Sequence, residues 1–129
     1  MDKWQDTVAA KSDQLNADDL LAGSIVIVIT QVTKVNGDQP MVINYQNDNG
    51  KPYKPNKTMR KIILAAWGSD DSQWIGRGMT LYCDPDVKWA GKPVGGIAIS
   101  QLSHIPKPME ANLNVTRGKK KLYKIGVLT

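Results

Sequence analysis

The chain has 129 residues, of which 41% are hydrophobic and 22% charged, and its net charge is +5. This length can bury a core within one domain, and the composition argues against wholesale disorder. No apolar run approaches the roughly 18 residues of a membrane span, residues 1–15 lack the apolar stretch of a secretory signal, and the single cysteine, Cys83, excludes an internal disulfide, as is typical of the reducing cytosol.

The first part of the chain is predicted to be helical and then to enter a long strand. Trp4, Val8 and Leu15 fall on one face of a helix, and a short turn completes an N-terminal segment at residues 1–23. Residues 24–35, SIVIVITQVTKV, are β-branched almost throughout and therefore predict a strand. Its first half is apolar on both faces and its second half is mixed, which suits a curved sheet or a barrel.

Turn residues separate the elements that follow. Asn36 and Gly37 form the dipeptide typical of a hairpin turn. A short helix is predicted over residues 68–78, with Ser69 as its N-cap and Trp74 packed in the core. Four further strands are predicted at residues 40–46, 58–67, 79–83 and 96–105.

This order predicts a mainly β protein. Five strands with one short helix between the third and the fourth have the connectivity of the oligonucleotide/oligosaccharide-binding (OB) barrel. The chain then divides into an N-terminal helical segment at 1–23, an OB-like barrel at 24–105 and a basic C-terminal extension at 106–129. The extension could add an edge strand, cross to another subunit or stay mobile, and the sequence leaves these alternatives open.

The sequence offers little for catalysis or for metal binding. Asp84 and Asp86 lie close to Cys83 but lack the further ligands of a metal site, so a turn is the simpler interpretation. Cys83 alternates in phase with Leu81 and should face the core, and His104, the only histidine, is interpreted as structural. No phosphate-binding or paired-carboxylate motif is present. We therefore expect no enzyme activity, no metal and no cofactor.

Basic and aromatic residues alternate in a way that favours a nucleic acid. Residues 51–61 carry five positive charges and no acid, and residues 107–124 carry six with one acid. Single-stranded bases stack on aromatic rings while Lys and Arg follow the phosphates. Trp67 and Tyr82 have an alternative role in packing, and the run at 118–121 is equally consistent with a solvated tail. The candidate binding residues are Tyr45, Tyr53, Lys54, Lys57, Arg60, Lys61, Trp67, Tyr82, Lys88, Trp89 and Lys92.

Four stretches of the chain resemble a family of small proteins of tailed bacteriophages. They are KSDQLNADDLLAG, NGKPYKPNKTMRK, WIGRGMTLYCDPDV and VGGIAISQLSHI, within residues 11–105. The resemblance implies an OB-fold protein of the single-stranded DNA-binding type, made in the cytoplasm of an infected bacterium. The chain departs from its relatives at Ala98 and Gln101, where they carry a basic residue and a histidine. This departure argues against a binding role for the outer end of the last barrel strand.

The expected function is therefore non-catalytic binding of single-stranded DNA in phage replication or recombination, with little sequence preference. Two alternatives remain. One is a protein-binding module that inhibits or recruits a host enzyme, and the other is binding of RNA or duplex DNA. The expected partners are single-stranded DNA and phage or host replication and recombination proteins, with no membrane. The oligomeric state is open.

Overall fold

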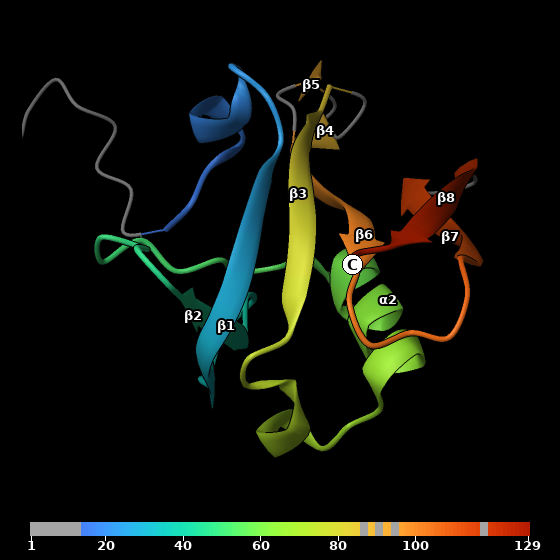
Figure 1. Cartoon of the computed structure of the whole chain (residues 1–129). Coiled ribbons are helices and arrows are strands. Elements are labelled where there is room, and N and C mark those ends of the chain that lie inside the picture. Colours follow the sequence, from blue (N-terminus) through green and yellow to red (C-terminus); the bar gives the residue numbers. More distant parts are fainter. Residues whose placement is uncertain (1–13, 86–87, 90–91, 94–95, 117–118) are drawn as a thin grey trace, which may run out of the picture.

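The structure of the protein is a computed structural model that describes residues 14–85, 88–89, 92–93, 96–116 and 119–129. Its described part is mainly β, as predicted (Figure 1). The 3₁₀ helices are η1 (Ala17–Leu20) and η2 (Asp71–Trp74), and the α-helix is α2 (Lys57–Trp67). The strands are β1 (Ile25–Lys34), β2 (Met41–Tyr45), β3 (Gly78–Asp84), β4 (Lys88–Trp89), β5 (Lys92–Pro93), β6 (Gly96–Leu102), β7 (Met109–Thr116) and β8 (Lys119–Val127).

Six of these strands form one sheet in the order β2-β1-β3-β6-β8-β7. Neighbouring strands are antiparallel except β6 and β8, which run parallel. The described sheet ends at β2 and β7 and is not closed into a barrel, so the expected five-stranded barrel is only partly found. The predicted N-terminal helix falls largely on residues 1–13, outside the described residues, while η1 confirms the short turn after it.

The predicted strand at 58–67 is wrong, because these residues form helix α2. The side chain of Asn56 caps the helix by accepting a hydrogen bond from the Met59 amide at 2.9 Å. Gly68 ends it with φ of 80°, a left-handed conformation that favours glycine. The buried side chains follow a helical period and lie on one face: Met59, Ile62, Ile63 and Trp67. Helix α2 packs this face towards the sheet, in contact with β6 and β7 (Figure 1).

A single β-bridge, at Tyr53, lies upstream of the predicted third strand. Tyr53 and Ile43 exchange two backbone hydrogen bonds, of 2.8 and 2.9 Å. Pro52 and Pro55 flank this position, and proline has no N–H to continue a ladder. The pairing with β2 is therefore limited to a single residue, Tyr53, which precedes the predicted strand at 58–67.

The core lies between the sheet and α2; it corrects one expectation and decides another that was open. The first strand buries Ile27 and Ile29, but Val26 is 58% exposed, so only one face of its first half is buried. The C-terminal extension belongs to the core, because β8 pairs with β6 and buries Tyr123 and Ile125. Of the three alternatives for the C-terminal extension, the structure shows the first: β7 and β8 add strands to the sheet. Within the described residues, no helix has the length and apolar character needed to span a membrane.

The other strands were found within a few residues of their predicted positions. Strands β1, β2, β3 and β6 confirm four of the five predicted strands, and η2 confirms the short helix, with Asp70 rather than Ser69 as its N-cap. Trp74 is buried as expected. Cys83 was expected in the core and is only half-buried, packed against the core cluster from outside it.

Candidate nucleic-acid interface

Four of the predicted phosphate contacts come together at the start of α2. We call Lys54, Lys57, Arg60 and Lys61 the basic strip. Lys57 and Lys61 are exposed and lie one turn apart on the helix, and Lys54 precedes it on the segment that leads from Tyr53 to the cap. Arg60 reaches back, because its Nη1 donates a hydrogen bond to the Pro55 carbonyl at 2.8 Å. Local helix geometry therefore fixes three of the four cations relative to one another.

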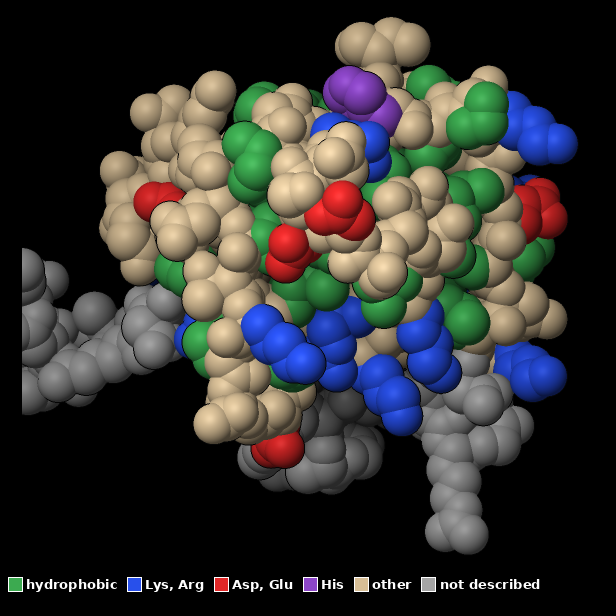
Figure 2. All heavy atoms as spheres, turned by 90° about the horizontal axis from the view of Figure 1, so that it is seen from below, with side chains coloured by type: hydrophobic (Ala, Val, Ile, Leu, Met, Phe, Trp, Pro, Cys, Tyr) green, Lys and Arg blue, Asp and Glu red, His purple; other side chains and the backbone are tan. Residues whose placement is uncertain are grey.

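The electrostatics of the strip favour an anion. Residues 49–69 contain no Asp or Glu. Within the described part of the chain, Lys57 and Lys61 have no ion-pair partner, whereas Lys51 and Lys121 lie 3.7 and 2.7 Å from carboxylates. The helix N-terminus adds a partial positive charge beside Lys57. Figure 2 shows several Lys and Arg side chains close together in the lower part of the face seen from below, with others apart from them.

Three of the predicted stacking residues are core residues instead. Tyr45, Tyr53 and Trp67 are 8%, 1% and 9% exposed. Burial raises the pKa of Tyr45, whose hydroxyl donates to the Lys51 carbonyl at 3.0 Å, and Trp67 Nε1 donates to the Ser103 carbonyl at 2.8 Å. A ring enclosed in this way has no free face for a base, so these three residues leave the set of stacking candidates.

Tyr82 is placed differently. It lies half-buried on β3 and lines a surface cavity of about 330 Å³ together with Cys83, Leu21 and Gly23. Part of its side chain is therefore accessible, and its contact with a nucleic acid stays a prediction. This cavity lies beside η1, whose Leu20 also lines it.

Two short paired strands, β4 and β5, lie in the chain between β3 and β6, and we call this pair the β4–β5 hairpin. Strands β4 and β5 pair Lys88 with Pro93 and Trp89 with Lys92. The side chains of Lys88, Trp89 and Lys92 lie outside what the structure describes, as does Asp86. Because the hairpin joins the ends of β3 and β6, it projects from one end of the sheet (Figure 1).

Asp84 has a structural role at the base of this hairpin. Its carboxylate is 2% exposed and accepts a hydrogen bond from Lys121 Nζ at 2.7 Å, and Lys121 Nζ also lies 5.3 Å from the Tyr123 ring centre. The hydrogen bond that Lys121 donates to Asp84 raises the pKa of Lys121. Among the described residues, no three His, Cys, Asp or Glu side chains come together as metal ligands.

We expect Asp84→Asn to lower the free energy of unfolding by about 1–3 kcal/mol, because it leaves Lys121 without its counter-charge; the half-exposure of Lys121 keeps the loss below that of a fully buried pair. Since the Lys121 pKa is raised, its contribution is full below the ordinary value of 10.5 and fades as the pH rises through the shifted value. Urea denaturation at two pH values measures both effects. Asp38→Asn, in the exposed turn after β1, is the control, and an equal loss in both variants would contradict the assignment.

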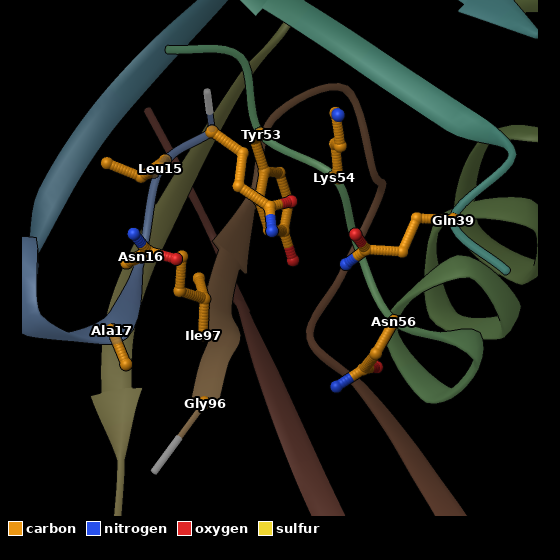
Figure 3. Close-up of a pocket in the computed structure, with 10 residues that line it drawn as sticks. Leu15, Asn16, Ala17, Gln39, Tyr53, Lys54, Asn56, Gly96 and Ile97 are labelled. Atoms are coloured by element: carbon orange, nitrogen blue, oxygen red, sulfur yellow. The ribbon is translucent and has the colours of Figure 1, made fainter. Parts of the chain in front are cut away.

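One cavity was not predicted from the sequence. It has a volume of about 190 Å³ and is lined by residues of four separate segments, close to the start of α2 (Figure 3). The lining residues are Gln14, Leu15, Asn16, Ala17, Gln39, Tyr53, Lys54, Asn56, Gly96 and Ile97. No local pattern signals such a site, because only folding brings residues 14–17, 39, 53–56 and 96–97 together.

No protein-family model, no curated protein and no solved structure matches this chain.

Proposed function

We propose that this chain binds single-stranded DNA without sequence preference and without catalysing a reaction on it. The observation that carries the proposal is the basic strip: four cations at the start of α2, three of them fixed by the helix, with no acid within residues 49–69. Such a strip can follow the phosphates of a flexible strand, and phosphate contacts supply most of the affinity of non-specific binding.

The connectivity supports an OB-like interpretation of the fold. The chain runs through β1, β2 and the Tyr53 bridge, then through α2, and then through β3 and β6. This is a three-strand meander, a helix and two strands, with the third strand reduced to one bridge and with a C-terminal hairpin added. In OB folds, the second and third strands and the loop between the fourth and fifth bind oligonucleotides. Those regions correspond here to the surroundings of Tyr53 and to the β4–β5 hairpin.

The setting proposed for this activity is phage replication or recombination in the cytoplasm of an infected bacterium. It follows from the resemblance to phage proteins and agrees with the basic composition. Replication or recombination proteins of the phage or the host are the proposed further partners.

A protein-binding module is the second candidate, and one observation favours it. A cavity of about 280 Å³ between the β1–β2 turn, α2 and η2 is lined by Met41, Leu64 and Trp74, and Leu64 is 43% exposed. An apolar partner side chain would fit there. Binding to such a partner should depend weakly on salt, whereas DNA binding should weaken steeply as salt rises.

The deciding experiment is a tryptophan-fluorescence titration with oligo(dT) of about 15 nucleotides, near the upper end of known OB site sizes. The proposal expects binding with a steep inverse dependence on salt. Competition with duplex DNA and with RNA of the same length separates the nucleic-acid alternatives. If no salt-sensitive binding of oligo(dT) occurs at low ionic strength, the proposal fails.

Trp89→Ala should weaken the binding of oligo(dT) by about 1–3 kcal/mol, the contribution of one base stacked on an aromatic ring. The slope of the salt dependence should not change, because no phosphate contact is removed. Lys88→Ala is the matched control on the same strand and should reduce the log–log slope by about 0.7. Equal binding by Trp89→Ala and the original protein would remove the hairpin from the interface.

A further inference from the structure

The cavity at the start of α2 contains an unusual polar group. Tyr53 is 1% exposed, and its hydroxyl has no hydrogen-bond partner among the residues that the structure describes. Burial raises the pKa of this hydroxyl, so it stays protonated and able to donate. A buried hydroxyl without a partner is costly, and most such groups are paired in native proteins. Figure 3 shows Tyr53 extending into the cavity, between Asn16 on one side and Gln39 on the other.

The lining of the cavity suits a ligand that both donates and accepts hydrogen bonds. Amide side chains dominate its polar surface, and each amide carries two donors and one acceptor. The oxygen of Asn56 is used by the helix cap, which leaves its NH₂ group to donate. Leu15 and Ile97 add apolar surface, and no carboxylate of the described residues lines the cavity. A phosphate would need donors only, whereas the edge of a nucleobase presents donors and acceptors together.

The size and the position of the cavity point to a single base. Its volume of about 190 Å³ lies below the roughly 300–1,000 Å³ of sites for drug-sized ligands, so it suits one heterocycle and not a base pair. Lys54 belongs both to the cavity lining and to the basic strip. A strand whose phosphates follow Lys57 and Lys61 therefore has the cavity beside its backbone.

We propose that this cavity takes one unstacked nucleobase of the bound strand, with the Tyr53 hydroxyl donating to the base and Lys54 holding the adjacent phosphate. This inference rests on the proposed binding of single-stranded DNA. It adds to the proposed contacts a base-dependent contribution that phosphate contacts alone cannot supply.

The test compares an oligo(dT) with an abasic strand of the same length, which carries the same phosphates without bases. The measured quantity is the ratio of the two dissociation constants. Tyr53→Phe removes only the hydroxyl, and we expect it to reduce the preference for oligo(dT) by about three- to tenfold, the range of one hydrogen bond. Its affinity for the abasic strand and its salt slope should stay unchanged. Gln39 is exposed, so Gln39→Ala leaves the core intact. It should also reduce the preference for oligo(dT) over the abasic strand.

Tyr45→Phe is the matched control, because Tyr45 is also a buried tyrosine but its hydroxyl has a partner, the Lys51 carbonyl. Tyr45→Phe should lower the melting temperature and leave the ratio unchanged. Tyr53→Phe should leave the melting temperature equal or higher, since the hydroxyl that it removes is unsatisfied in the free protein.

The outcomes separate the two proposals. If the original protein binds both strands and Tyr53→Phe keeps the full preference for oligo(dT), the base pocket is overturned and the DNA-binding proposal stands. If Tyr53→Phe weakens both strands equally, the hydroxyl contacts the backbone, and the base pocket is likewise overturned. If neither strand binds in a salt-sensitive way, the proposed function itself fails.

Discussion

The double variant Lys57→Glu and Lys61→Glu should bind oligo(dT) at least about 100-fold more weakly than the original protein. Each lysine is proposed to make a charge-assisted hydrogen bond to a phosphate, worth about 1.5–3 kcal/mol. Two such losses amount to about 3 kcal/mol or more, which corresponds to two powers of ten in affinity. The slope of the salt dependence should fall by about 1.4, or 0.7 for each phosphate contact.

The fold should survive this change. Both positions are exposed on the first two turns of α2, and acidic side chains near a helix N-terminus interact favourably with the helix dipole. Circular dichroism and the melting temperature check this directly. A loss of binding that accompanies unfolding would carry no information about the strip, which is why the milder pair Lys57→Gln and Lys61→Gln belongs in the same series.

The matched control is the double variant Lys107→Glu and Lys124→Glu, which changes the net charge by the same amount. Both lysines are exposed, on the loop after β6 and on β8. That loop lies at the far end of α2, because Trp67 in the last turn bonds to the Ser103 carbonyl. Screening over about 8 Å at physiological salt limits the effect of distant charges, so we expect less than about a threefold loss. Equal losses in both double variants would mean that only net charge matters and that the strip is not the interface.

Much of the sheet could be predicted because the strands have local signals. Strand β1 is β-branched almost throughout, and Asn36-Gly37 marks the turn after it. Helix α2 could not be predicted with the same rule. Its sequence, KTMRKIILAAW, contains a short apolar run, and such a run fits a buried strand as well as a buried helix. The cap at Asn56 and the spacing of the buried residues decide in favour of the helix, and both signals were present in the sequence.

The candidate site could be predicted only in part, for a different reason. Lysines are exposed almost by default, so Lys57 and Lys61 were found where the sequence indicated. The exposure of an aromatic ring depends on what packs against it, and the tertiary structure buries Tyr45, Tyr53 and Trp67. The cavity beside Tyr53 depends wholly on contacts between segments that are far apart in the chain.

The assignment of α2 leads to the largest expected effect on stability. Ile62→Ala should lower the free energy of unfolding by about 2–5 kcal/mol, because the side chain is fully buried and its removal leaves a cavity in the core. Leu64→Ala should cost less than about 1 kcal/mol, since Leu64 is 43% exposed. The two positions are two residues apart, which places them on the same face of a strand but on nearly opposite faces of a helix. Urea denaturation at 25 °C measures both changes. Similar losses of unfolding free energy at both positions would favour the strand predicted from the sequence. A large loss at Ile62 and a small one at Leu64 would support the helix that fixes the basic strip.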